Sequence, residues 1–416
     1  VNNYIDKLRI YELNPGNGDY QYLQRSFIMD ADQMEDREEA IYIATESQSI
    51  FPNATVKHGS TDYSSGAEIV SELNSINHGF YSFHGHGNPG TITLCGAAGI
   101  GAIDNDHYRD WYITKESGNA LDCLTNKYFP NICYSISCTV MPYDIYSGYD
   151  VYYNFGESYT LGKNYGGVAF LGNTRSGFFD FYKNERFKNS AYLEKCFIDQ
   201  LKKDNFKIGI AEANSKMMEN SPNLSEDYSH DIRLTHNLLG DPEFEIWTDI
   251  PVKYTDADFV INRNATSISI SGNYGDSCKI VARNTNGDVH SKTVAPNETA
   301  SFSVSPNSAI MIYRHNMIPY IPTLCLQNEN IILSQRVFAN DVKMGANVDG
   351  NRATGNITFG NNVDYIIDAN GDVEIDTGFV VLNTGKVTIN TQGTVTIKGG
   401  SVRSGGTLNI NAANVI

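Results

Sequence analysis

Apolar runs and amphipathic stretches alternate along residues 1–250. The apolar runs have the length of buried strands, and the longer stretches carry apolar residues at helical spacing. Strands are predicted at 26–32, 54–56, 80–83, 132–138 and 166–172, and helices at 1–13, 37–49, 67–76, 155–161, 190–203 and 208–219. Strands that alternate with helices predict an α/β fold, in which helices cover both faces of a parallel sheet. Residues 87–127, rich in Gly, Asp and Asn, are predicted to form a long functional loop region.

The pattern changes at Pro251, where polar and apolar residues begin to alternate singly. Segments such as Ser267–Ser271 and Lys279–Ala282 have the period of half-buried strands, and Gly, Asn and Asp residues separate them. This texture predicts a small β-sandwich over residues 251–322.

Residues 323–416 are poor in charge and rich in Gly, Asn, Thr and Val. Short β units recur at Val373, Val387, Val395 and Leu408, but the intervals between them are unequal, so no fixed repeat is evident. We predict a β-rich, solenoid-like stack for this module, with a second sandwich as the alternative.

The composition is that of a folded protein, with 41% hydrophobic and 19% charged residues. The net charge of −17 argues against a nucleic-acid partner, because the chain has no basic stripe that could displace counterions. No apolar run reaches the length of a transmembrane segment. Seven cysteines leave at least one thiol free, and their spacing matches no metal-ligand motif.

Two of the predicted strands end on residues typical of a catalytic site. The strand that begins at Phe80 runs into Gly85-His86-Gly87, and the strand that begins at Ile132 ends at Cys138. Glycines beside a histidine let the backbone approach a ligand closely. In open α/β sheets the ends of the strands carry the chemistry, so a His and a Cys there predict a thiolate–imidazole pair.

These motifs resemble those of the gingipain family, which are caspase-like bacterial cysteine peptidases. The segment Asn237–Glu243 is similar to the one that closes the gingipain catalytic domain. The resemblance covers residues 1–250 and, more weakly, an Ig-like domain at 251–322. It implies a caspase-like parallel-sheet sandwich and a secreted or cell-surface bacterial enzyme. Gingipain-like enzymes have a smaller subdomain before the point where this chain begins, so we expect that subdomain to be missing or to be a separate chain.

The resemblance also assigns roles to single residues. Cys138 is the expected nucleophile and His86 the expected general base, while the backbone N–H groups of Gly87 and Cys138 would bind the oxyanion. Asp32 lies where the family carries an acid that orients the histidine. Each role has a structural alternative: Cys138 could be a buried core thiol, as Cys133 is expected to be, and Asp32 could be a helix cap.

A zinc site is the alternative interpretation of the same motifs. His84 is two residues before His86, so on a strand both would point to one side, and Cys138 would be a third ligand. No fourth ligand and no HExxH helix accompany them, so we favour the peptidase and expect His84 to be a packed residue. We expect no metal at the site and no required cofactor; a structural calcium ion is left open.

The resemblance suggests which residue precedes the cleaved bond. In arginine-specific members of the family, an acid shortly after the orienting residue forms the base of the specificity pocket. Asp36 is that acid by rough alignment, and Asn173, Thr174 and Phe178 are the candidate walls. A carboxylate there would bind Arg bidentately and Lys as a point charge. The alternative is that Asp36 only stabilises the first turn of a helix.

The sequence therefore predicts a cysteine endopeptidase that acts on proteins or peptides, with a preference for a basic residue before the cut. The alternative is an adhesion or binding protein on a decayed peptidase fold, because the 323–416 module has low charge and open β edges that suit attachment to a cell surface. Neither a nucleic acid nor a transmembrane segment is expected.

Overall fold

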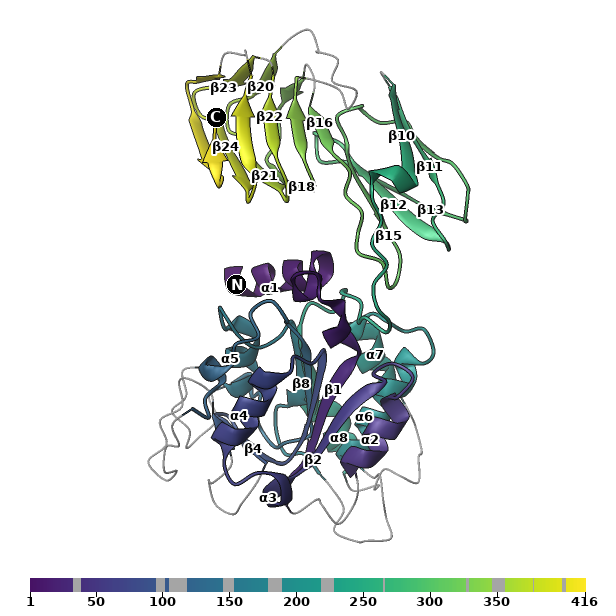
Figure 1. Ribbon diagram of the computed structural model, residues 1–416, viewed down its shortest axis with the longest axis vertical. Helices are drawn as coiled ribbons and strands as arrows, with labels where there is room; N and C mark the ends of the chain where they lie inside the picture. Colours follow the sequence, from purple (N-terminus) through teal and green to yellow (C-terminus); the bar gives the residue numbers. More distant parts are fainter. Residues whose placement is uncertain are drawn as a thin grey trace. The chain divides into compact units, whose positions relative to one another are not determined.

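The computed structural model contains two compact units, Val1–Pro251 and Val252–Ile416 (Figure 1). It describes residues 1–32, 39–94, 102–104, 118–144, 153–178, 189–217, 228–264, 266–326, 329–345, 356–376, 378–398 and 402–416.

A six-stranded sheet forms the centre of the first unit, with the strand order β2-β1-β3-β7-β8-β9. Neighbouring strands are parallel except for β8 and β9. The strands are β1 (Arg25–Asp30), β2 (Asn53–His58), β3 (Phe80–His84), β7 (Ile132–Ser135), β8 (Ala169–Asn173) and β9 (His236–Gly240). The predicted parallel sheet is confirmed, and its antiparallel last strand is an addition that the sequence pattern did not predict.

Helices cover both faces of this sheet, with α4 and α5 on one side and α2, α6 and α7 on the other (Figure 1). Each predicted helix is present; α5 has the predicted bounds, and the ends of the others differ by a few residues. None of the described helices is long and apolar enough to cross a membrane. The helices are α1 (Asn2–Leu13), α2 (Glu39–Ser47), α3 (Gly59–Asp62), α4 (Gly66–Ser75), α5 (Phe155–Leu161), α6 (Asn189–Leu201), α7 (Ile208–Ser215) and α8 (Ser229–Thr235).

Alternation along β3 gives the two faces of the sheet different characters. Tyr81 and Phe83 belong to an apolar cluster that includes residues of α4 and α5. Ser82 and His84 point the other way and contact Glu194 of α6. The first face gains about 1.5–3 kcal/mol for each large apolar side chain buried. The second face also buries apolar residues such as Phe80, but at the end of β3 it buries charged groups, which are stable there only when each has a partner.

The region 87–127, predicted as a long loop, contains further strands. β4 (His86–Asn88), β5 (Thr91–Thr93) and β6 (Ala102–Asp104) form a small antiparallel sheet. His86 is therefore the first residue of a paired strand, which fixes its backbone better than a loop would.

Two three-stranded antiparallel sheets begin the second unit, in the orders β10-β11-β14 and β13-β12-β15. Ile268 and Phe302 of one sheet and Ile280 and Ile312 of the other belong to one buried cluster, so the sheets share a core. The strands are β10 (Phe259–Asn264), β11 (Ser267–Gly272), β12 (Cys278–Arg283), β13 (Val289–Val294), β14 (Ala300–Phe302) and β15 (Ala309–Tyr313).

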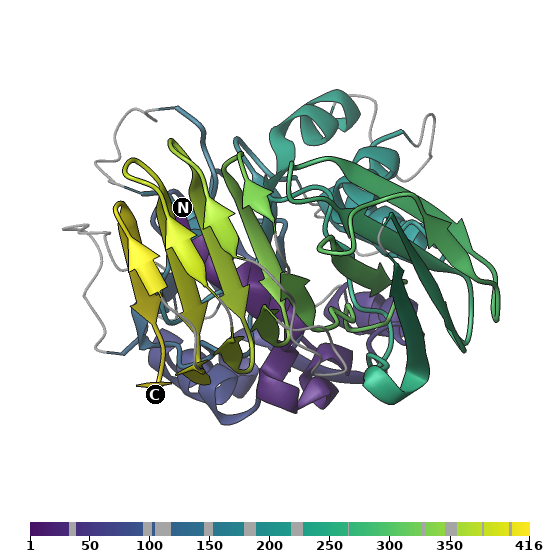
Figure 2. The same cartoon turned by 90° about the horizontal axis from the view of Figure 1, so that it is seen from above.

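The remaining strands form three parallel sheets, and every third strand along the chain returns to the same sheet. Figure 2 shows strands from successive turns of this coil side by side, from green to yellow. They are β16 (Leu324–Leu326), β17 (Asn330–Ile331), β18 (Gln335–Ala339), β19 (Val342–Met344), β20 (Ile357–Phe359), β21 (Asp364–Ala369), β22 (Val373–Ile375), β23 (Phe379–Val381), β24 (Lys386–Thr391), β25 (Thr394–Ile397), β26 (Val402–Ser404), β27 (Thr407–Asn411) and β28 (Asn414–Val415).

The pairing of these strands reveals a regular repeat that the unequal intervals in the sequence did not establish. Val373 pairs with Val395, and Val387 pairs with Leu408. The two pairs span nearly the same length of chain, which is one turn of the coil. They belong to different sheets, so intervals counted between all four residues mixed two faces of the coil and hid the repeat.

Candidate active site

The two sequence motifs meet at the carboxyl ends of β3 and β7, the two central strands of the six-stranded sheet. β3 and β7 are parallel neighbours with Phe83 opposite Ser135, so the segments that follow them leave the sheet together. A Cβ atom added to Gly87 would lie only 2.7 Å from Ser137 Cβ and 2.8 Å from the carbonyl oxygen of Cys138. Only glycine fits here, and its absent side chain lets the residue after His86 pack directly against Cys138.

The structure separates the two cysteines of the β7 region. Cys138 lies three residues beyond the end of β7, and its side chain is partly exposed. Thr139, the next residue, has a φ of 52°, which residues other than glycine adopt infrequently, so the chain turns sharply after the thiol. Cys133 lies inside β7, where burial raises the pKa of its thiol well above the ordinary value. The accessible thiol of the pair is Cys138.

His86 and His84 do not point to the same side, contrary to our expectation. β3 ends at His84, and β4 of the small antiparallel sheet begins at His86, so the strand alternation is broken at Gly85. The side chain of His86 is exposed, whereas that of His84 is fully buried. His86 is thus accessible to a substrate, and His84 is not.

A buried ionic network surrounds His84. Its Nδ1 atom lies 2.6 Å from Asp30 Oδ1, and its Nε2 atom lies 2.8 Å from Glu194 Oε2. Ser82 Oγ donates to Glu194 Oε1 at 2.6 Å. Burial alone would lower the pKa of His84, but the charge of Glu194 and hydrogen bonds with both carboxylates raise it well above the ordinary value. With an acceptor at each nitrogen, His84 is an imidazolium ion.

This network contradicts the zinc alternative. Both ring nitrogens of His84 are occupied by carboxylates, so neither is available to a metal shared with His86 and Cys138. Within the described residues, the metal-binding atoms that gather within 4.8 Å of one another belong to Asp30, Glu39 and His84. That group includes neither His86 nor Cys138.

Asp32 lies two residues beyond the end of β1. Its Oδ1 atom accepts a short hydrogen bond from the N–H of Ser60, in the first turn of α3. A Cβ atom on Gly59 would overlap that carboxylate, so glycine is required where Asp32 meets the start of α3. This contact fits the helix-cap alternative, but with α3 as the capped helix instead of the helix that follows Asp32 in sequence.

The candidate pocket walls have different environments. Asn173 is fully buried, and its Nδ2 atom donates to the carbonyl oxygens of Ile136 and Ser137, so its described contacts support the Cys138 loop. Thr174 is partly buried and bonds to Thr235 through its N–H and its hydroxyl. Phe178 is partly buried and stacks on Tyr228, with ring centroids 4.5 Å apart. Asp36 lies outside the described residues.

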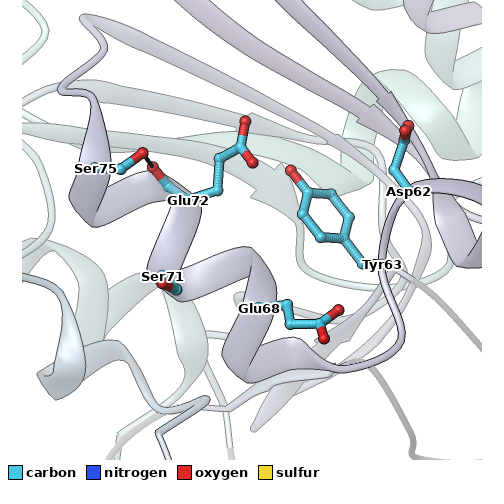
Figure 3. Close-up of a pocket in the computed structure, with 6 residues that line it drawn as sticks. All are labelled: Asp62, Tyr63, Glu68, Ser71, Glu72 and Ser75. Atoms are coloured by element: carbon cyan, nitrogen blue, oxygen red, sulfur yellow. Dashed lines mark hydrogen bonds between the residues drawn. The ribbon is translucent and has the colours of Figure 1, made fainter.

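A shallow hollow lies on the outer surface of α3 and α4 (Figure 3). Three of its six lining residues are acidic, and none is a predicted site residue. The lining residues are Asp62, Tyr63, Glu68, Ser71, Glu72 and Ser75.

Comparisons with known proteins give the family. Residues 1–247 match the model of peptidase family C25. No match was found among the curated proteins. A solved structure described as "Structure of Protease" is similar at a TM-score of 0.52 and 16% identity, covering 77% of this chain and 70% of that one, which shows a shared fold. Because the family model spans more than half of the chain, the chain belongs to peptidase family C25, the gingipain family, and is a cysteine-type endopeptidase.

Proposed function

We propose that this protein hydrolyses peptide bonds with Cys138 as nucleophile and His86 as general base. The observation that carries the proposal is the packing of Gly87 against the Cys138 loop, because it brings the two motifs together at the carboxyl ends of β3 and β7. Cys138 is partly exposed and His86 is exposed, so a substrate can reach both. Cys133, in contrast, is enclosed by the core.

The reaction would proceed through an acyl-enzyme. His86 takes the thiol proton, and the Cys138 sulfur attacks the peptide carbonyl carbon. The protonated His86 then gives its proton to the amine as the C–N bond breaks. Water, deprotonated by His86, attacks the thioester and releases the acid and the thiol. By analogy with the family, the N–H groups of Gly87 and Cys138 bind the oxyanion, and such a donor is worth about 3–4 kcal/mol in other hydrolases.

The proposal also assigns roles to the residues expected to orient the histidine and to form the specificity pocket. Asp32 would orient His86, although its hydrogen bond from Ser60 already occupies one carboxylate oxygen. Asp36 would form the base of a pocket for a basic side chain. Thr174 and Phe178, which follow β8 close to Cys138, would line that pocket, whereas Asn173 is better suited to a supporting role.

The proposal extends to the second unit and to the location of the protein. The shared core of the two antiparallel sheets supports an Ig-like sandwich for residues 251–322. The three parallel sheets support a β-solenoid for residues 323–416, which would attach the enzyme to a cell surface after secretion. These assignments rest on the family resemblance as well as on the strand pairing.

Matched cysteine variants test the nucleophile. Cys138→Ala should abolish hydrolysis of a fluorogenic peptide and labelling by a peptidyl electrophile, with little change in unfolding temperature. Cys133→Ala should keep both activities but lower the unfolding temperature, since it leaves a small cavity in the core. Full hydrolysis by Cys138→Ala would refute the mechanism. A wild-type protein that neither hydrolyses peptides nor reacts with the electrophile would favour the adhesion protein on a decayed peptidase fold.

A further inference from the structure

The segment Asn173–Phe178, here named the β8 strap, encloses the loop that carries Cys138. Thr139 donates its N–H to the carbonyl oxygen of Arg175 at 2.7 Å, and Met141 donates its N–H to that of Asn173 at 3.1 Å. Gly177 donates its N–H to Cys138 Sγ at 3.3 Å. The strap therefore contacts the thiol itself as well as the backbone that follows it.

Both ends of the β8 strap are anchored. The N–H of Thr174 donates to the carbonyl oxygen of Thr235 at 2.7 Å. The N–H of Phe178 donates to Ser190 Oγ at 3.0 Å, and the N–H of Ser190 donates back to the carbonyl oxygen of Phe178 at 3.0 Å. Anchors at both ends hold the intervening peptide groups in place before any substrate binds.

Asn173 fixes the direction of the peptide group that precedes Cys138. Its Nδ2 atom donates to the carbonyl oxygens of Ile136 at 2.9 Å and Ser137 at 3.1 Å. In a trans peptide the C=O and the N–H point in opposite directions. The described chain has no cis peptide bond, so a Ser137 carbonyl held toward Asn173 turns the N–H of Cys138 away from it. That N–H is the proposed oxyanion donor.

Gly177 approaches the same loop more closely than any other residue type could. A Cβ atom there would lie 2.1 Å from the carbonyl oxygen of Ile136 and 2.6 Å from Asn173 Nδ2. The neutral thiol of Cys138 has an acceptor in the Gly177 carbonyl oxygen, 3.5 Å from Sγ. Once the proton has left, the N–H of Gly177 remains as a donor to the thiolate. Hydrogen bonds to ionised groups are roughly twice as strong as neutral ones.

We propose that the β8 strap is part of the catalytic apparatus: Gly177 stabilises the Cys138 thiolate through its backbone N–H, and Asn173 is a positioning residue that aims the N–H of Cys138 at the substrate carbonyl. This inference rests on the proposed role of Cys138 as nucleophile. The strap supplies the Cys138 sulfur with a hydrogen-bond donor, the N–H of Gly177. The same contacts explain why an asparagine and a glycine lie four residues apart, at 173 and 177.

Two variants of the full chain test the inference. Gly177→Ala forces the strap away from the sulfur, and Asn173→Asp sets a carboxylate oxygen against two carbonyl oxygens. The matched control is Asn126→Asp, because Asn126 is also buried and its Nδ2 atom also donates to two backbone carbonyl oxygens, those of Phe129 at 3.2 Å and Gly166 at 3.0 Å. Neither of those partners belongs to the Cys138 loop.

Three measurements are made on each variant: kcat and KM on a fluorogenic peptide, the unfolding temperature, and the rate of iodoacetamide alkylation at Cys138 across pH, followed by mass spectrometry. We expect kcat to fall at least about tenfold in both strap variants, with KM little changed. In Gly177→Ala the midpoint of the alkylation profile should move to higher pH by about one unit. Asn126→Asp should lower the unfolding temperature and leave both the kcat and the midpoint unchanged.

The inference is overturned if the strap variants lower only the unfolding temperature, as the control does. Should Asn173→Asp not fold, Asn173→Ser removes the two donated hydrogen bonds without adding charge, and the same kcat loss is expected. The outcome is separable from that of the proposed function. If Cys138→Ala still hydrolyses peptides, the nucleophile is wrong; if Cys138→Ala is inactive while both strap variants keep full kcat, only the role of the strap is wrong.

Discussion

Replacing Glu194 by Ala should destabilise the first unit strongly, because it removes one of the two carboxylates around His84. Glu194 lies 2.8 Å from His84 and 2.6 Å from Ser82 through its two oxygens, and all three side chains are buried. Removing one partner of a buried ion pair costs about 3–5 kcal/mol. In a unit of this size each kcal/mol lowers the unfolding temperature by about 2–4 °C, so we expect a fall of about 10 °C.

The same pair predicts a pH dependence. The pKa of His84 is raised in the folded protein, so its stabilisation is fully present below the unfolded value of about 6.5 and is lost as the pH rises through the folded value. Glu194→Gln removes the charge and keeps the shape, which lowers the folded pKa of His84. In this variant the decrease in the free energy of unfolding should therefore begin at the same pH, near the unfolded pKa, but should end at a lower pH and be smaller in total than in the wild type.

Urea unfolding followed by tryptophan fluorescence measures both effects, because the two tryptophans, Trp111 and Trp247, belong to the first unit. The control is Glu46→Gln, which removes a partly exposed ion pair with Lys202 at 2.7 Å and should cost less than about 1 kcal/mol. Two results would contradict this reasoning: a loss of unfolding free energy in Glu194→Ala no larger than in the control, or a wild-type pH dependence of stability in Glu194→Gln. Either would mean that His84 and Glu194 do not form a buried ion pair.

Three further predictions concern other parts of the chain. Burial lowers the pKa of Lys7 to about 7, against an ordinary value of 10.5. The free energy of unfolding, measured with urea, should therefore rise between about pH 7 and pH 10.5 in the wild type and not in Lys7→Met. An equal rise with pH in the two proteins would contradict this. A chain that ends near Pro322 should still hydrolyse small peptides, since the proposed site lies wholly in the first unit, and a folded but inactive truncation would argue against it. A positional-scanning peptide library should show that the enzyme prefers Arg or Lys before the cut. This preference should fall at least about tenfold in Asp36→Asn and stay unchanged in Glu38→Gln. A preference for apolar residues that Asp36→Asn does not alter would mean that Asp36 only stabilises the start of a helix.

The periodicity of residues 1–250 was enough to predict most of the peptidase fold. α5 shows why: its start at Phe155 is marked by a capping box in which Asn154 and Glu157 exchange hydrogen bonds, a local signal that needs no tertiary information. No such local signal marks the antiparallel strand β9, whose residues Asn237–Gly240 resemble a family motif that does not specify a strand. The repeat of the coil was hidden for a different reason, since residues of two sheets were counted as one series.

The candidate site could be predicted only where its residues lie next to glycines or strand ends. His86 and Cys138 carry such signals, whereas the partner of His84 does not. Glu194 is far from His84 in sequence, on a helix whose pattern says only that one side is apolar. Asp30 is opposite His84 in the strand register and could have been paired with it. The prediction that His84 and His86 share a face obscured this, because it continued a strand past the residue where β3 ends.

Two separate supports hold the two halves of the proposed site, and this separation has a measurable consequence. The His84 network fixes the end of β3, from which the chain continues to His86, while Asn173 fixes the loop of Cys138. A loss of the network through Glu194→Ala should therefore impair the acid–base role of His86 and leave the Sγ–Gly177 contact in place. In such a protein kcat would fall while alkylation of Cys138 by iodoacetamide, measured at high pH where the thiolate forms without a base, would keep its wild-type rate. A parallel loss of both would mean that the strand ends move as one body and that the two supports are not independent.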